Sequence, residues 1–511
     1  MWEEGCDDGT RRIAGRGMMA KSLWLIAVCV MGPAFVVMLG RAAAPAQGAD
    51  AFAPGGTESG RPDSSRLGGG TAADESDRRR GELEALRISK KFFVRTTNLC
   101  KEERALDCQS QGITIASDGN CYFASSTHSD SRGAMVFKYD PVAAEVARIC
   151  DDISDVCGEN PATQAPQGML FTNPVEVDGW VYWGTHCAFS GAGAGKPYSG
   201  GHVVGYNLKT REWRDLGIPA RGCAIFAGLA ADAKNKRLFA TATPIGEKES
   251  EATRLYRMDL PDGKWQDAGM VSYGGLVGYQ GIWVDMQGRC WLAAAAGALL
   301  CYDPAANAMR GWLDAMPRAC TDRGFPDPDA SVQTLRMWDW VRPIPSQNQC
   351  LFTLKGGAGF YYFTPGSIGR GPGAPFGALR PLSGYTGQGC AVAEERIYFV
   401  RSVTLASAPG VSLLHLASIG YTDDKAEVAD HGAIVDDKGR VPRRLESVAA
   451  DSKGRVYMVG DWGTIAGDAT SLVNRANDPY LVASRAQFFA TGELPPEKAP
   501  LRPPARAPAS R

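Results

Sequence analysis

Residues 281–293 read GIWVDMQGRCWLA, and residues 298–304 read ALLCYDP. The first stretch holds an apolar segment, a tight turn around Asp285 and Gly288, and a second segment rich in aromatic residues, which predicts two short antiparallel strands. The second stretch predicts a third strand, ending on Tyr302-Asp303, a pair that suits the start of another turn. This unit decides the fold, because it recurs along the chain.

Three further copies are clear: ITIASDGNCYFAS at 113–125, VEVDGWVYWGTH at 175–186 and LAADAKNKRLFAT at 229–241. The turns at Asp118, Asp178, Asp232 and Asp285 follow one another at intervals of 60, 54 and 53 residues. Two degenerate copies near 349–365 and 391–399, and a last copy SVAADSKGRVYMV at 447–459, bring the number to seven. Such repeats predict an all-β chain folded as a single β-propeller of seven four-stranded blades.

The ends of the chain have a different composition from the repeats. Residues 1–46 place basic residues before an apolar run at 23–39 and small residues after it, which predicts a signal peptide or an N-terminal membrane anchor. Residues 47–86 predict a disordered linker and residues 491–511 a disordered Pro-rich tail. The propeller is then expected over 87–490, with Phe92–Thr97 pairing beside 480–489 to join the first and last blades. A β-sandwich with a second domain is the alternative architecture.

The export prediction places the body of the protein in the periplasm or outside the cell, attached to a membrane only through residues 23–39 if these are retained. Of 14 cysteines, Cys6 and Cys29 lie in the targeting segment, which leaves an even number. Cys100 with Cys108 and Cys150 with Cys157 are close enough in sequence to form disulfides in an oxidising compartment. No CxxC pair or regular Cys/His spacing indicates zinc.

Composition and motifs exclude several function classes. The chain of 511 residues has 55 basic and 56 acidic side chains and a net charge of −1, which argues against a nucleic-acid binder that works by bulk charge. GxSxG, Walker, dinucleotide-binding, HExxH and CxxCH motifs are absent. The sequence assigns no metal and no cofactor, and we expect a monomer.

Candidate site residues lie in the longer connections that share one face of the predicted propeller. His128 ends FASSTH and His186 ends YWGTH, so a Thr-His pair recurs at equivalent places on adjacent blades. Tyr198 lies in a glycine-rich loop that His202 closes, and Arg221 lies in the next inter-blade loop. Glycine runs of this kind permit close approach of a ligand, although they also suit a flexible loop. The histidines can equally be residues that hold neighbouring loops together.

The repeats GIWVDMQGRCWLA and ALLCYDP resemble those of secreted bacterial propellers related to virginiamycin B lyase and the gluconolactonase-like group. This resemblance covers about residues 112–460 and implies the fold. Gluconolactonase-like enzymes hold a divalent metal with acidic and Asn residues, and this sequence has no matching set. Propeller polysaccharide lyases use His, Tyr and Arg at the channel mouth, and His128, His186, Tyr198 and Arg221 offer these residue types.

Two functions follow from this reading. One is an exported propeller that binds a glycan, a small ligand or a protein partner at its loop-rich channel mouth. The alternative is a polyuronate lyase acting by β-elimination, with His128 or His186 as base, Tyr198 as acid and Arg221 stabilising the enolate-like charge.

Overall fold

The computed structural model describes residues 88–100, 106–107, 112–187, 195–245, 252–273, 281–294, 297–312, 315–316, 338–344, 347–354, 359–365, 376–381, 385–393, 395–407, 412–421, 427–463 and 487–494. All of them belong to one compact unit, Ser64–Arg511. The predicted signal peptide or anchor and the linker lie outside the described residues. No helix in the described part of the chain is long and apolar enough to cross a membrane.

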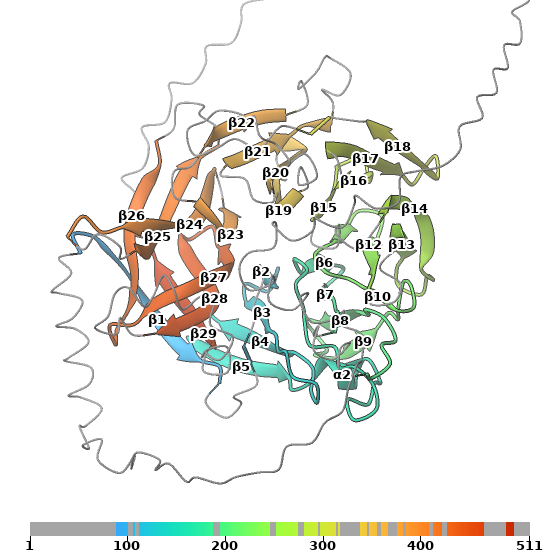
Figure 1. The fold of residues 1–511 in the computed structure, drawn as a ribbon, viewed down its shortest axis with the longest axis horizontal. Helices are drawn as coiled ribbons and strands as arrows, with labels where there is room; N and C mark the ends of the chain where they lie inside the picture. Colours follow the sequence, from blue (N-terminus) through green and yellow to red (C-terminus); the bar gives the residue numbers. More distant parts are fainter. Residues whose placement is uncertain are drawn as a thin grey trace, which may run out of the picture. The chain divides into compact units, whose positions relative to one another are not determined.

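The described strands form six antiparallel or mixed sheets that follow one another around an axis, as a β-propeller does (Figure 1). The first sheet contains β2 (Ile113–Ile115), β3 (Cys121–Ser125), β4 (Met135–Asp140) and β5 (Glu145–Cys150). The second contains β6 (Val175–Val177), β7 (Trp180–Gly184), β8 (Val203–Asn207) and β9 (Trp213–Asp215). The third contains β10 (Cys223–Ala224), β11 (Leu229–Asp232), β12 (Arg237–Pro244), β13 (Ala252–Asp259) and β14 (Gln266–Tyr273).

The fourth sheet contains β15 (Ile282–Val284), β16 (Cys290–Ala294), β17 (Ala298–Asp303) and β18 (Ala308–Trp312). The fifth contains β19 (Trp338–Ile344), β20 (Gln349–Leu354), β21 (Gly359–Phe363) and β22 (Phe376–Pro381). The sixth has eight strands, in the spatial order β23 (Tyr385–Ala393), β24 (Arg396–Thr404), β25 (Ser412–Gly420), β26 (Ala429–Asp436), β1 (Lys91–Asn98), β29 (Gln487–Glu493), β28 (Arg455–Gly463) and β27 (Val441–Ala450). A single turn of helix, α2 (Ile153–Val156), lies between the first two sheets in the sequence.

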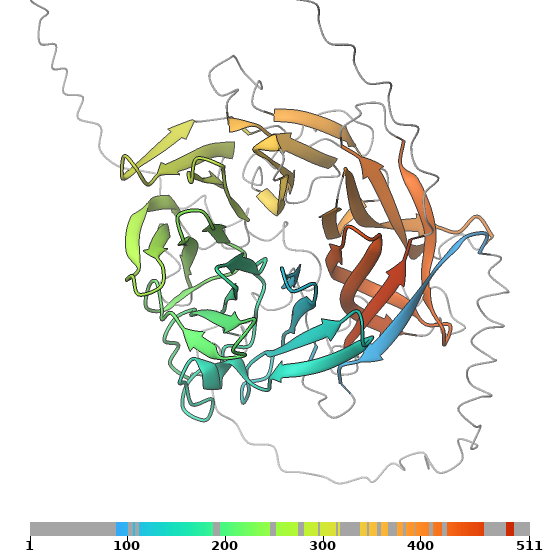
Figure 2. The same cartoon turned by 180° about the vertical axis from the view of Figure 1, so that it is seen from behind.

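Strand β1 joins the two halves of the sixth sheet (Figure 2). It runs parallel to β26, with Phe92 opposite Ile434, and antiparallel to β29, with Thr97 opposite Phe489. The predicted pairing of this segment with the last strand is therefore confirmed at Phe489. The expectation that it joins the last blade to the first was wrong, because its other neighbour is β26 and the first sheet is separate. The strand β29 also continues to Glu493, three residues past the expected end of the propeller at 490, because its ladder with β28 continues to Arg455.

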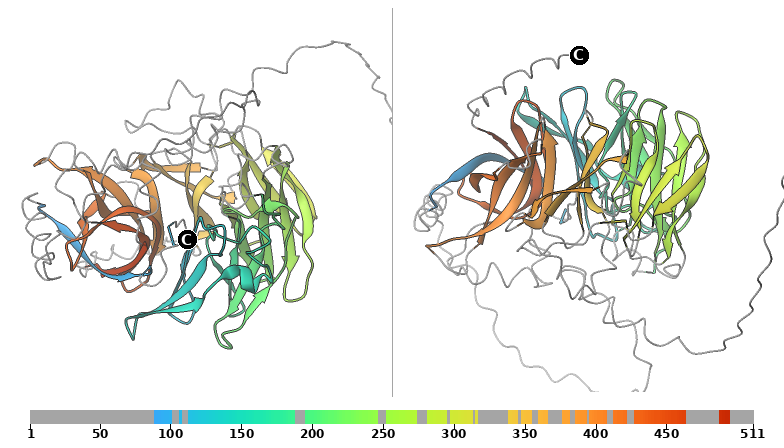
Figure 3. Two further views of the ribbon diagram at one scale, coloured as in Figure 1. Left: turned by 60° about the horizontal axis from the view of Figure 1, so that its bottom comes forward. Right: turned by 90° about the horizontal axis from the view of Figure 1, so that it is seen from above.

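Apolar clusters between consecutive sheets hold the ring together. The side views show the backbone of these sheets, one after another around the ring (Figure 3). Trp183 packs between the first and second sheets, Phe239 and Tyr302 between the third and fourth, and Trp338 between the fourth and fifth. Further clusters join the second sheet to the third and the fifth to the sixth. Another joins Phe123 of the first sheet to residues of the sixth, so the ring is closed. Each sheet is too small to bury its own apolar faces, and packing against the neighbouring sheets buries them.

A further cluster packs β23–β26 against β27–β29, so the sixth sheet is continuous in hydrogen bonding but has two packed halves. The all-β propeller is confirmed. The number of seven blades stays a prediction, because the described strands form six sheets rather than seven separate ones.

Several of the tight turns are clamped by the Asp of the repeat. The Asp285 carboxylate accepts hydrogen bonds from Arg289 Nε at 2.8 Å and Trp291 Nε1 at 2.8 Å. Asp451 holds its own turn in the same way. Gly288 has a φ of 77°, a left-handed conformation that glycine adopts without strain. The repeating Asp and Gly residues therefore act in folding, at what is here called the turn end of the sheets.

Candidate functional site

All four predicted site residues lie at the opposite, loop end of the first three sheets, where second strands connect to third strands and each sheet connects to the next. His128 follows β3 and His186 follows β7. Both strand ends adjoin the segment that leads into β6. The Thr127 N–H donates to the Gly168 carbonyl at 2.8 Å, and His186 exchanges backbone hydrogen bonds with Met169 at 2.9 and 3.0 Å. The two histidines thus end equivalent strands of neighbouring sheets.

His128 is oriented by a carboxylate. Its Nδ1 lies 2.9 Å from Asp107 Oδ1, and the same oxygen accepts the His128 backbone N–H at 3.1 Å. Asp107 belongs to the segment between β1 and β2, so the two residues come from different connections. The His128 side chain is 34% exposed. An imidazole held at Nδ1 by a carboxylate, with part of its ring in solvent, can contact a ligand in a defined orientation.

His186 is packed inside the protein, with an exposed fraction of 1%. Its ring lies 5.0 Å from that of Phe171 and 4.6 Å from that of Phe226, and its Nδ1 lies 2.9 Å from the Cys187 carbonyl oxygen. Burial lowers the pKa of His186 to about 3, so the ring is neutral at pH 7. A polymer cannot reach this ring in the structure, and its contacts are those of a core residue.

Tyr198 and Arg221 lie on adjoining segments but have different environments. The Gly222 N–H donates to the Ser199 carbonyl at 2.8 Å, and the Gly201 N–H donates to the Cys223 carbonyl at 2.7 Å, which fixes the two segments together. The Tyr198 hydroxyl oxygen is buried, and burial raises its pKa well above 10. Arg221 is exposed in the turn before β10. The structure therefore does not gather His186, Tyr198 and Arg221 around one accessible point.

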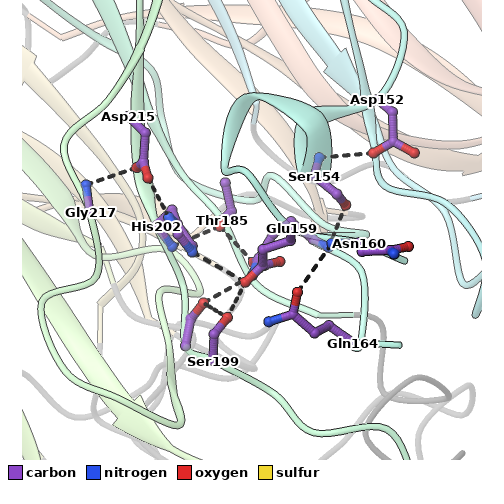
Figure 4. A network of polar contacts seen from close by, with 12 residues as sticks. Asp152, Ser154, Glu159, Asn160, Gln164, Thr185, Ser199, His202, Asp215 and Gly217 are labelled. Carbon is purple, nitrogen blue, oxygen red and sulfur yellow. Dashed lines mark hydrogen bonds and ion pairs between the residues drawn. The ribbon is translucent and has the colours of Figure 1, made fainter. Parts of the chain in front are cut away.

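The polar centre of this region is an imidazole between two carboxylates (Figure 4). His202, at the start of β8, places Nε2 3.2 Å from Glu159 Oε1 and Nδ1 2.9 Å from Asp215 Oδ2. The His202 and Glu159 side chains are 7% and 4% exposed, and that of Asp215 is 25% exposed. Ser199 Oγ also donates to Glu159. The connection after α2, the loop before β8 and strand β9 thus meet at one charged group.

Neutral side chains complete this network. Gln167 Nε2 donates to Glu159 Oε2 at 2.9 Å, and Thr185 Oγ1 donates to Gln167 Oε1 at 2.7 Å. The His202 backbone N–H in turn donates to Thr185 Oγ1 at 2.9 Å. Buried polar groups that are satisfied in this way fix the positions of the segments that carry them.

The charges of this network are set by its hydrogen bonds. Burial alone disfavours the protonated form of His202, but hydrogen bonds to Asp215, Cys157 and Glu159 outweigh it and raise the pKa of His202 to about 12. Burial opposes ionisation of Glu159 too, and the hydrogen bonds from His202, Ser199 and Gln167 lower its pKa below 4.5. His202 is therefore an imidazolium at neutral pH and cannot act as a general base there.

Lys196 ties the same region to the loop that carries His128. Its Nζ donates to the carbonyl oxygens of Pro161 at 2.7 Å and Asp130 at 2.5 Å. These two carbonyls belong to the connection after α2 and to the β3–β4 connection. Three connections are thereby held together beside His128.

Glu159, Asp215 and Gln167 were not among the candidates from the sequence, and His202 was noted only for its place in the loop. They lie 8 to 43 residues from their partners along the chain, and they share no spacing with the repeat. The one usable indication was the second histidine of the glycine-rich loop.

The described residues include most of the cysteines and all five histidines, which are possible metal ligands. No group of three or more His, Cys, Asp or Glu side chains suited to a metal ion occurs in the described segments. Cys150 and Cys157 are buried free thiols, and Cys100 is a free thiol whose predicted partner Cys108 lies outside the described residues. The structure therefore does not contain the predicted Cys150–Cys157 disulfide, and the Cys100–Cys108 disulfide stays a prediction.

No family model matches the chain, and no curated protein matches its sequence. Comparison with solved structures gives matches of low sequence identity and low TM-score. A chain of the mitotic checkpoint complex is 10% identical, with a TM-score of 0.41 over 81% of this chain and 95% of that one. An oligogalacturonate lyase from Vibrio parahaemolyticus is 9% identical, with a TM-score of 0.42 over 79% of this chain and 98% of that one.

An ulvan lyase bound to a GlcA-Rha3S repeat is 8% identical, with a TM-score of 0.35 over 57% of this chain and 78% of that one. Likeness at this level says nothing about function. The resemblance to secreted propellers of the lyase and gluconolactonase-like groups stays a prediction.

Proposed function

We propose that the protein binds an external ligand, a glycan, a small molecule or a protein segment, at the loop end of its first two sheets, with His128 as a contact residue. The observation that carries this proposal is the Asp107–His128 pair, a partly exposed imidazole held by a carboxylate on a surface of three joined connections. The export predicted from residues 1–46 would place this surface in the periplasm or outside the cell.

The rigidity of the surface supports binding. Glu159, His202 and Asp215 fix the connections from inside, and Lys196 fixes them from outside. A surface that is ordered before the ligand arrives does not pay the entropic cost of ordering on binding.

The axis of the ring is a weaker candidate than the surface over the first two sheets. Asn173 Nδ2, just before β6, donates to the Val341 carbonyl in β19 at 3.3 Å. Because the second and fifth sheets are not neighbours, this bond places protein atoms across the axis at that level. The site is therefore proposed to lie off the axis, beside His128.

Binding of the full chain to a panel of immobilised neutral and acidic polysaccharides tests this proposal. His128→Gln keeps a polar side chain of similar size, and we expect it to weaken binding at least tenfold. Lys236→Gln is the matched control, since Lys236 forms an exposed ion pair with Asp178 at the turn end. Equal binding by both variants would contradict the placement of the site.

The second candidate function is β-elimination on a polyuronate, and the Asp107–His128 pair favours it too. A carboxylate that orients an imidazole is the arrangement that general bases use. Absorbance of the conjugated product, followed with the intact protein and with His128→Gln, tests this candidate. Product formed by the parent protein and lost in the variant would establish a lyase. A full rate in the variant would exclude His128 as its base.

A further inference from the structure

A second polar cluster crosses the β23–β26 half of the sixth sheet (Figure 1), away from the candidate site. Arg401 on β24 lies directly opposite His415 on β25, and Asp430 follows on β26. His415 Nδ1 lies 3.1 Å from both Asp430 carboxylate oxygens. Arg401 Nη2 donates to Asp430 Oδ2 at 2.5 Å, and the Gly432 N–H donates to Oδ1 at 2.8 Å. The three side chains form one hydrogen-bonded row.

Two nitrogen atoms of this row are buried without a hydrogen-bond partner among the described residues: His415 Nε2 and Arg401 Nε. The His415 side chain is only 10% exposed, so solvent does not satisfy its free nitrogen. Residues directly opposite on antiparallel strands have Cβ atoms about 4.5–5.5 Å apart, so both nitrogens belong to one small region. An unsatisfied buried polar group is destabilising, which makes an absent hydrogen-bond partner the simplest explanation.

The charges of the three side chains indicate which kind of ligand can bind to the two unsatisfied nitrogens. The carboxylate of Asp430 can only accept, so His415 Nδ1 carries a proton, and Nε2 carries one only in the imidazolium. With a neutral imidazole, the charges of Arg401 and Asp430 cancel. With an imidazolium, the row has a net positive charge and two donors, Arg401 Nε–H and His415 Nε2–H. An oxyanion can accept from both donors and offset that charge.

We propose that Arg401 and His415 form a binding site for a small oxyanion, of the carboxylate or sulfate class, which binds together with one proton on His415. Within the row, the charged groups that contact one another are the Arg401 guanidinium and the Asp430 carboxylate, and His415 lies against that carboxylate. The Lys90 ammonium donates to the Asp430 backbone carbonyl. His431 is separate, since its Nε2 lies 2.7 Å from Ser418 Oγ. The site is independent of the function proposed for the loop end of the first two sheets.

Calorimetric titration of the full chain with sodium sulfate, at constant ionic strength balanced with chloride, tests the proposal. Sulfate keeps its charge across pH 6–8, so a change in affinity reports on the protein. We expect saturable binding that is at least tenfold weaker at pH 8 than at pH 6. We also expect the uptake of about one proton at pH 8, measured from buffers that differ in heat of ionisation.

His415→Gln and Arg401→Gln should each abolish sulfate binding, and His431→Gln, in the same sheet, should leave it unchanged. Two variants are used because either alone can fail to fold, and circular dichroism melts identify such a failure. Absence of binding in the parent protein would overturn the proposal in favour of an internal water molecule. Binding that persists in both folded variants would overturn it in favour of an adventitious ion only.

Discussion

His202 holds the segments at the loop end together, as an imidazolium between Glu159 and Asp215. Replacing it by Gln removes the positive charge between Glu159 and Asp215 and leaves a buried carboxylate without its counter-charge. Breaking a buried ion pair from one side typically costs about 3–5 kcal/mol. We expect His202→Gln to lower the free energy of unfolding by about that amount, measured by urea denaturation at pH 7. A change under 1 kcal/mol would show that the network is not a stabilising element.

The same residue predicts how stability depends on pH. The pKa of His202 is raised to about 12 in the folded protein, against about 6.5 unfolded. Its contribution is therefore fully present below pH 6.5 and is lost as pH rises towards 12, because only the folded state keeps the proton in that window. The free energy of unfolding should fall between pH 7 and 9 in the parent protein, and fall less steeply in His202→Gln.

His186 predicts the opposite dependence. Its pKa of about 3 in the folded protein means that the unfolded state alone binds a proton between pH 6.5 and 3, so stability falls as the solution is acidified. His186→Phe keeps an aromatic ring between Phe171 and Phe226. We expect it to cost about 1 kcal/mol at pH 7.5 for the lost hydrogen bond, but to reduce the loss between pH 6 and 4 by up to about 1.4 kcal/mol per pH unit. Equal acid sensitivity of both proteins would show that His186 becomes protonated in the fold.

At the scale of elements, β1 offers a matched pair of neighbouring residues. Phe92 is buried in the cluster between the halves of the sixth sheet, and Phe93, the next residue, is 65% exposed on the other face. Phe92→Ala should lower the free energy of unfolding by about 3–5 kcal/mol, the usual cost for a buried phenylalanine. Phe93→Ala should change it by under about 0.5 kcal/mol. Thermal melts of both variants measure these effects. A larger loss of stability in Phe93→Ala than in Phe92→Ala would show that the strand buries its other face.

The elements also show what the sequence could and could not predict. Strands, turns and their order followed from local patterns, because several of the Asp and Gly turns carry their own clamp within six residues, as Asp285 does with Trp291. The pairing of β1 with β29 was anticipated from its apolar residues, and the parallel pairing with β26 was not. Parallel strands cannot be joined by a short turn, so no local sequence pattern indicates that they pair.

Site residues were harder to predict than strands for a physical reason. From the sequence, a histidine can be judged only by its position in the repeat, and His128 and His186 occupy equivalent positions. The structure separates them, since one ring lies partly in solvent beside Asp107 and the other lies between two phenylalanines. Burial depends on connections from other sheets, which repeat spacing does not contain.

For the whole molecule, ring closure predicts a sharp boundary for truncation. Removal of residues 1–87 leaves β1 and both its ladders intact, whereas removal of residues 1–98 deletes the strand that joins the halves of the sixth sheet. We expect the first protein to melt cooperatively and the second to lose its cooperative transition, as followed by near-ultraviolet circular dichroism. Similar melts for both would show that the ring holds without β1.

The place of β1 in the ring also affects the order of events during synthesis. Lys90, at the edge of this strand, meets a partner 340 residues later in the chain. At about 5–20 residues per second, the ribosome needs about 20–70 s to make that partner. Throughout this time the first strand has neither of its final neighbours, and its bare edges are open to wrong partners. A holding factor for the nascent chain would therefore have its greatest effect on the earliest strand, which is made first and completed last.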